Sequence, residues 1–128
     1  MKLYDTIVIG AGAAGLFYGA LSEPGADSLI IDHSERPGLK LLLSGSGQCN
    51  ITHDGSIKDF ISRYGQNGRY IRSVLYSANS LSLIEFLNKN GIKTITREDG
   101  KIFPESLKAS EILNMLIKKS EANGFPLL

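Results

Sequence analysis

The 128-residue sequence has little of the chemistry that marks several protein classes. Its single cysteine, Cys49, excludes an internal disulfide and a four-cysteine zinc site, and makes a reducing compartment the default. The formal net charge is only +1, so composition offers no argument for nucleic acid, anionic lipid or a polyacidic partner. With 42% hydrophobic residues the chain is nevertheless ordinary for one globular domain and too apolar to be disordered.

The sequence also lacks an apolar run long enough to cross a membrane. The uncharged stretch 6–22 follows Lys2 and superficially resembles a signal peptide or a span. It falls short of the ~20 residues that a span requires, and Asp5 interrupts the basic start of a signal peptide. Its glycines each lower helix propensity by about 1 kcal/mol relative to alanine. We therefore expect a soluble, cytoplasmic protein with neither a membrane nor a nucleic-acid partner, and the oligomeric state stays open.

Residues 1–32 predict a βαβ unit. The apolar, β-branched run at 4–9 stops at Gly10, as a strand buried on both faces does. The Ala- and Leu-rich segment 13–21 suits a helix ending near Pro24-Gly25, and 28–31 reads as a second buried strand closing on Asp32. Such a unit requires a parallel strand pair with a right-handed crossover, which makes the fold class α/β.

The segment between these strands matches the dinucleotide-binding fingerprint Gly-x-Gly-x-x-Gly. Gly10 allows the tight turn, Gly12 lets the main chain approach a pyrophosphate, and Gly15 permits close packing of helix on strand. The N–H groups around Ala13 and Ala14, at the start of the helix, favour the phosphate charge. Asp32, about 20 residues further on, is placed to accept hydrogen bonds from an adenosine ribose. The alternative is a glycine-rich turn that binds nothing, and the fingerprint alone does not choose between NAD and FAD.

The rest of the chain divides into a loop, 33–55, and a region of helices with one hairpin, 56–128. The loop has no periodicity and crowds glycine and serine around Leu41–Leu43, which favours a functional loop over a linker. Beyond it the pattern predicts helices at 57–64, 69–76, 81–90 and about 110–122, and a hairpin of 92–97 with 101–103 around Asp99-Gly100. Ser110 is the expected N-cap of the last helix, and Asn123-Gly124 its stop. The apolar segment 125–128 begins what reads as another strand without a partner.

Four further segments carry a resemblance to a known family. The segments ERPGLK (35–40) and LLSGSGQCNIT (42–52), then DGKIFP (99–104) and KAS (108–110), are similar to signatures of bacterial flavoproteins described as FAD-dependent oxidoreductases of the aminoacetone-oxidase type, related to a bile-acid reductase. The resemblance covers nearly the whole chain. It implies the N-terminal, Rossmann-like FAD-binding portion of a flavoprotein of the two-dinucleotide-binding type. Because members of that family are much longer, it also implies that residues 1–128 are an incomplete, N-terminal piece.

The resemblance also implies which residues bind the cofactor. Gly10, Gly12 and Gly15 hold the FAD pyrophosphate together with Ala13 and Ala14, and Asp32 holds the ribose beside His33. The residues implied to wrap the flavin side are Lys40, Ser44, Gly45, Gly47, Cys49 and Asn50. Lys40 as a solvated surface residue and the Ser/Gly loop as a linker remain open alternatives. The sequence departs from the family pattern at Ser46, where a glycine is typical, and at Gln48, where an arginine is typical; the family also commonly has glutamate in place of Asp32.

Other reactive residues give no catalytic pattern. Flavin disulfide reductases need two cysteines, so Cys49 reads better as a small buried residue than as a redox centre. His33 and His53 lack metal-ligand spacing, so no metal site is predicted, and Ser44 lacks the context of a hydrolase nucleophile. Three hypotheses survive: an FAD-dependent oxidoreductase that uses NAD(P)H as electron donor on an unknown small-molecule substrate, an NAD-binding Rossmann module, and a catalytically silent fragment. No residue is assigned as a catalytic acid or base.

Overall fold

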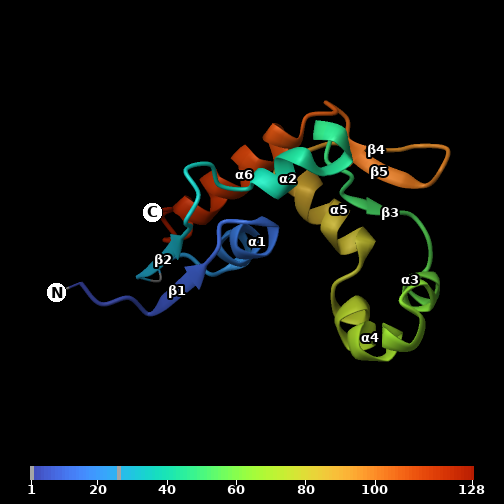
Figure 1. Ribbon diagram of the computed structural model, residues 1–128, viewed down its shortest axis with the longest axis horizontal. Helices are drawn as coiled ribbons and strands as arrows, with labels where there is room; N and C mark the ends of the chain where they lie inside the picture. The colour runs from blue at the N-terminus through green and yellow to red at the C-terminus, as the bar shows by residue number, and fades with distance from the viewer. Residues whose placement is uncertain (1, 26) are drawn as a thin grey trace. The chain divides into compact units, whose positions relative to one another are not determined.

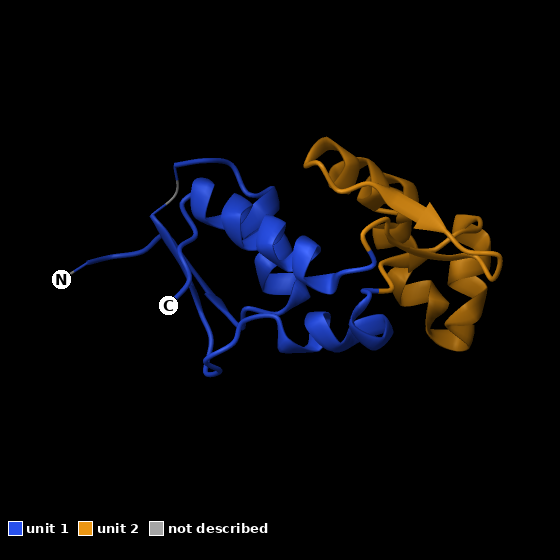
Figure 2. Cartoon of the chain, turned by 90° about the horizontal axis from the view of Figure 1, so that it is seen from above, with its two compact units in different colours: residues 1–49, 107–128 blue, residues 50–106 orange. Residues whose placement is uncertain are grey.

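A computed structural model describes residues 2–25 and 27–128 and divides the chain into two compact units (Figure 1, Figure 2). Unit 1 comprises Met1–Cys49 and Leu107–Leu128, and unit 2 comprises Asn50–Ser106. This division differs from the expected segments 1–32, 33–55 and 56–128, because the last helix packs on the first helix of the chain rather than on the hairpin that precedes it. Unit 2 is thus an insertion within unit 1.

The βαβ unit is present in unit 1. Strand β1 (Thr6–Ile9) and strand β2 (Ser28–Ile31) pair in parallel with Thr6 opposite Ser28, and helix α1 (Ala13–Leu21) connects them. The expectation that both strands are buried on both faces holds for β2 but is wrong for β1. Ile7 is 53% exposed and Ile9 is 85% exposed, because no described residue covers that side of β1 or pairs with its second edge.

The C-terminal segment 125–128 has a partner, contrary to expectation. Leu127 forms a parallel bridge with Ile30, and the Ile30 N–H donates to Pro126 O at 2.9 Å while the Leu128 N–H donates to Ile30 O at 2.9 Å. β2 therefore lies between β1 and this segment. Parallel strands in the order 3-2-1 are one half of the Rossmann arrangement.

Helix α6 (Ala109–Ala122) covers unit 1 by packing on α1. Gly19 permits the close approach, because a Cβ there would lie 2.9 Å from Ser120 Oγ. Ser120 Oγ lies 2.9 Å from Leu16 O, and Asn123 Nδ2 donates to Gly19 O and Ala20 O at 3.1 Å. These polar contacts fix α6 against α1 over a core that includes Ile30, Leu116 and Phe125.

Residues 33–55 are not wholly irregular. They contain a short helix, α2 (Leu39–Leu43), a 3₁₀ segment, η1 (Ser44–Gly47), and a two-residue strand, β3 (Thr52–His53). The sequence concealed α2 because its five residues are too few to display a helical period. α2 packs against α6, and η1 follows it directly.

Unit 2 combines an antiparallel sheet with three helices. The sheet has the order β3-β5-β4, in which β4 (Thr94–Thr96) and β5 (Lys101–Pro104) form the predicted hairpin around Asp99-Gly100. The helices are α3 (Ile57–Arg63), α4 (Gly68–Ser77) and α5 (Ser80–Lys89), with a 3₁₀ turn, η2 (Gly65–Asn67), between α3 and α4. All three helices were predicted to within one or two residues, and α3 packs on α4.

One helix start was predicted wrongly. The N-cap of α6 is Lys108, and Ser110 lies inside its first turn. Leu107 has φ of 55°, so the chain turns sharply there and the helix begins at Ala109. Among the described residues, no helix has both the length and the apolar character needed to span a membrane.

Candidate functional site

The glycine loop after β1 is anchored by backbone hydrogen bonds. The Gly10 N–H donates to Ile31 O at 2.7 Å, which continues the β1–β2 pairing. Ala11 is fully buried, and its carbonyl accepts a hydrogen bond from the Gly38 N–H at 2.8 Å. The turn that precedes α1 is therefore held both by β2 and by the start of α2.

The three fingerprint glycines have three different environments. Gly10 has φ of +103°, a conformation that L residues rarely adopt. Gly15 has no room for a side chain, since a Cβ would collide with Gly10 O and lie 3.1 Å from Val8 Cγ1. Gly12 has neither constraint: its φ is −84°, and a Cβ would meet no protein atom within 4 Å. The folded chain alone therefore gives no reason for glycine at position 12.

The start of α1 presents unpaired backbone donors to solvent. Gly12 is the N-cap and supplies no side-chain cap, and Ala13 and Ala14 are exposed. The first N–H groups of a helix have no intrahelical acceptor, and the helix dipole adds partial positive charge there. The local geometry therefore fits the pyrophosphate of a dinucleotide approaching past Gly12.

Asp32 is at the predicted place, but its carboxylate already has backbone partners. Oδ2 accepts from the Ala11 N–H at 2.6 Å, and Oδ1 accepts from the Ser34 N–H at 2.8 Å. These hydrogen bonds, that from Ser34 first, hold the pKa of Asp32 below its ordinary value. Each oxygen retains a second lone pair, so Asp32 can hold the loop and still accept from a ribose hydroxyl. His33 is fully exposed beside it, with Nδ1 3.5 Å from Asp32 Oδ1.

The segment implied to wrap the flavin is a run of left-handed backbone. Gly45, Ser46 and Gly47 have φ of 56°, 56° and 85°, and Ser44 Oγ donates to Leu41 O at 2.7 Å. Gly45 and Gly47 are exposed, as is Lys40 on α2. The hydrogen bond from Gly38 to Ala11 brings the beginning of α2 to the glycine loop. Contact of Lys40 or of 44–47 with a cofactor stays a prediction.

The last two predicted residues follow this segment directly, and the Cys49 N–H donates to Ser44 O at 2.9 Å. Cys49 is only 3% exposed, and burial raises the pKa of its thiol, so the neutral thiol is its stable form. This environment favours the structural interpretation of Cys49 over a reactive thiolate. Asn50 is exposed and is the first residue of unit 2.

Three contributors to the site were missed by sequence reasoning: Ala11, Ser34 and Gly38. Two of them act through backbone atoms that carry no sequence signature, because the Ala11 and Ser34 N–H groups bind Asp32. Gly38 did have a signal, since Pro37-Gly38 is a turn dipeptide. Gly38 has φ of +67° and begins α2, and a Cβ there would collide with Leu113 Cδ1.

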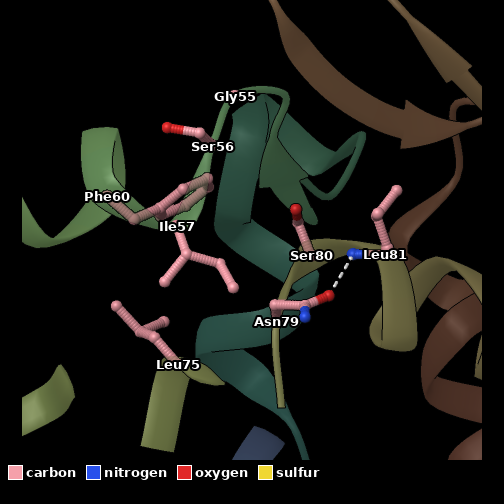
Figure 3. A pocket seen from close by; sticks show the side chains of 8 residues that line it. All are labelled: Gly55, Ser56, Ile57, Phe60, Leu75, Asn79, Ser80 and Leu81. Atoms are coloured by element: carbon pink, nitrogen blue, oxygen red, sulfur yellow. Dashed lines mark hydrogen bonds between the residues drawn. The ribbon is translucent and has the colours of Figure 1, made fainter. Parts of the chain in front are cut away.

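Hollows occur in both units within the described residues. A cavity of about 140 Å³ in unit 2 is lined mainly by apolar side chains of α3, α4 and α5, and Figure 3 shows Phe60, Leu75 and Leu81 around it. It includes none of the predicted cofactor-binding residues. A shallow groove of about 380 Å³ runs along β1 in unit 1 and touches Ala14, Gly15 and Tyr18. In the described part of the chain, no three His, Cys, Asp or Glu side chains gather as a metal site would require.

Comparison with known protein families identifies the family of this chain. Residues 4–128 match the family described as the HI0933-like protein Rossmann domain. The chain belongs to this family of FAD-binding flavoproteins. The α/β fold class and the Rossmann-type parallel sheet predicted from the sequence are thereby confirmed.

Curated relatives of this HI0933-like chain come from several bacteria. It is 35% identical over 94% of its length to the ribosomal RNA dihydrouridine synthase of Escherichia coli (strain K12), and 32% identical over 97% to that of Haemophilus influenzae. It is 31% identical over 85% of its length to the 3-dehydro-bile acid delta(4,6)-reductase of Clostridium scindens. The chain spans 27–30% of the length of these relatives.

A solved structure shares the fold of the HI0933-like chain. The crystal structure of Thermovibrio ammonificans THI4 matches 98% of this chain and 38% of its own, with a TM-score of 0.61 and 15% sequence identity. At that identity the likeness concerns the fold alone.

Proposed function

We propose that this chain is the cofactor-binding portion of an FAD-dependent oxidoreductase and that the FAD pyrophosphate lies at Gly12 and the start of α1. The observation that carries the proposal is Gly12 itself. Neither backbone conformation nor packing requires glycine there, whereas a ligand approaching the helix start does. Membership of a flavoprotein family supports FAD over NAD as the dinucleotide.

Asp32 is the proposed ribose acceptor. It lies at the end of β2, adjacent to the loop, and at neutral pH its carboxylate is ionised and accepts hydrogen bonds. A carboxylate at this place also disfavours the 2′-phosphate of NADP, through like-charge repulsion. Asp32 is thus proposed to have two functions: it accepts the hydrogen bond that holds the Ala11 N–H, and it accepts hydrogen bonds from the ribose hydroxyls.

The names of the relatives indicate the reaction class. Dihydrouridine is uridine with one ring double bond reduced, and a delta(4,6)-reductase likewise reduces carbon–carbon double bonds. FAD held at Gly12 and Asp32 would supply the hydride chemistry for such a bond, with a donor of the NAD(P)H class as the source of the hydride and a proton added at the other carbon. Of the two substrate types, uridine in RNA has the support of the two relatives that match more of the chain.

The test compares FAD binding with folding in variants of Gly12. Because a Cβ at this position meets no protein atom within 4 Å, Gly12→Ala and Gly12→Val should lower the thermal unfolding midpoint only by the small cost of a poorer N-cap. Gly12→Val should weaken FAD binding by tenfold or more, measured by calorimetric titration, because its methyl groups occupy the pyrophosphate approach. Ala122→Leu, which adds the same number of carbon atoms at an exposed helix end, is the matched control.

Two outcomes would contradict the proposal. A Gly12→Val variant that binds FAD as well as the parent would refute the pyrophosphate position. Binding of NAD⁺ that FAD does not displace would favour the alternative of an NAD-binding module.

A further inference from the structure

We infer that the outer face of α4 in unit 2, defined here as Arg69, Tyr70, Arg72 and Tyr76, is a binding surface for single-stranded RNA. Arg69, Arg72 and Tyr76 are spaced at i, i+3 and i+7 and therefore share one side of the helix, with Tyr70 beside them. All four are exposed, while Ile71 and Leu75 on the other side are partly buried. The inference rests on the proposed function insofar as that function names RNA as the substrate.

The two arginines of this face are available to phosphate. No Asp or Glu occurs in the sequence between Asp59 and Glu85, and none of the ion pairs found among the described residues includes Arg69 or Arg72. Arg63 on α3 is different, because its charge acts on Asp59, and we leave it out of the surface. Thus the net charge of +1 conceals a local excess of positive charge on one helix.

The tyrosines give this face a second property. Tyr70 and Tyr76 are 67% and 50% exposed, so each ring presents aromatic surface to solvent. Each ring has a guanidinium beside it: Arg69 Cζ lies 4.6 Å from the centre of Tyr70, and Arg72 Cζ lies 5.8 Å from that of Tyr76. Arg69 Nη2 also donates to Tyr70 Oη at 2.6 Å.

Paired arginines and exposed aromatic rings are the combination that unpaired nucleic acid requires. Guanidinium N–H groups neutralise successive phosphates, and bases that are not paired stack on tyrosine rings. A duplex would bind the arginines but could not stack its paired bases on the tyrosine rings, and an acidic peptide has no bases to stack on them. The ribosomal RNA named for two relatives is a polymer of this chemistry.

The experiment measures binding of the chain to a fluorescently labelled mixed-sequence RNA oligonucleotide at several salt concentrations. Arg69→Ala/Arg72→Ala should weaken binding at least tenfold and reduce the slope of log K against log[salt] by about 1.4, at ~0.7 for each phosphate contact on a single strand. Tyr70→Ala/Tyr76→Ala should weaken binding about tenfold or more, and Tyr70→Phe/Tyr76→Phe should restore most of it, because the ring is what stacks.

Lys89→Ala/Lys93→Ala is the matched control, since it removes the same charge from exposed positions of the same unit. Equal weakening by the two charge variants, or no weakening by the arginine variant, would overturn the inference. Vesicles of phosphatidylglycerol that bind through Arg69 and Arg72 when RNA does not would assign the face to an anionic membrane instead. FAD titration of the same variants separates the two proposals, since α4 substitutions should leave FAD binding unchanged and Gly12→Val should leave RNA binding unchanged.

Discussion

At the scale of single residues, Ser46 occupies a backbone conformation that favours glycine. Ser46 stands where the resembling flavoproteins typically have glycine, and its φ and ψ are 56° and 41°. A left-handed conformation costs an L residue about 1–2 kcal/mol, whereas glycine adopts it freely. The chain thus tolerates local strain in η1, between two glycines of the same conformation.

Replacing Ser46 by glycine should therefore stabilise the chain. The relief of strain is partly offset by the greater freedom of glycine in the unfolded state, so the free energy of unfolding should rise by about 0.5–1 kcal/mol. Urea unfolding measures the change. Ser46→Ala removes the same hydroxyl but keeps the Cβ and should give no gain; an equal gain from alanine would show that strain is not the cause.

Acid should destabilise the chain through Asp32, whose folded pKa lies below the ordinary value of 3.8. A carboxylate with a lowered pKa contributes its full stabilisation above the unfolded pKa and loses it as the pH falls through the folded one. The thermal midpoint should therefore be level above about pH 5 and decline below pH 4. In Asp32→Asn this decline should be smaller, because the two backbone donors no longer bind an ionisable group. If the thermal midpoint of Asp32→Asn fell as steeply below pH 4 as that of the parent, Asp32 would not be the cause of the decline.

At the scale of secondary structure, the sequence predicted what local pattern determines. The βαβ unit, the hairpin at Asp99-Gly100 and helices α3 to α6 were all foreseen, because each has its own period and its own stop residue. The features that the sequence did not predict depend on residues far apart in the chain. The pairing of Leu127 with Ile30 joins residues far apart in sequence, and the exposure of Ile9 depends on what does not cover β1.

β1 is also the element with the clearest association risk. Its second edge pairs with no described strand, and an exposed apolar edge is a template for other chains. Ile9→Lys should therefore reduce self-association of the chain, measured by sedimentation velocity across a concentration series. Leu81→Lys adds the same charge at an exposed helix position in unit 2 and is the control. If both substitutions suppress association equally, the added charge and not the strand edge is responsible.

At the scale of the whole molecule, the candidate site is predictable in part. Gly10, Gly12, Gly15 and Asp32 are identified by spacing alone. Gly10 and Gly12 lie in the loop before α1, Gly15 in α1 packs against Gly10, and Asp32 accepts from the Ala11 N–H of that loop. The hydrogen bonds that hold this loop and Asp32 in place were not predictable, because they are made by the backbone groups of Ala11, Ser34 and Gly38. The two-unit division was likewise hidden, since the α1–α6 contact that defines unit 1 spans the insertion of unit 2.

The extent of this site predicts weak retention of FAD by the chain alone. Binding sites for ligands of this size enclose most of the ligand surface. Gly12, Ala13 and Ala14 are exposed, and together with Asp32 they are proposed to hold only the pyrophosphate and ribose. Gln48 in place of the family's arginine supplies no charge to assist. FAD should therefore bind in titration and be lost on desalting, whereas the purified Escherichia coli relative, of which this chain matches 30%, should stay yellow. A stoichiometric flavin absorption band in the desalted chain would show that these residues form a self-sufficient FAD-binding module.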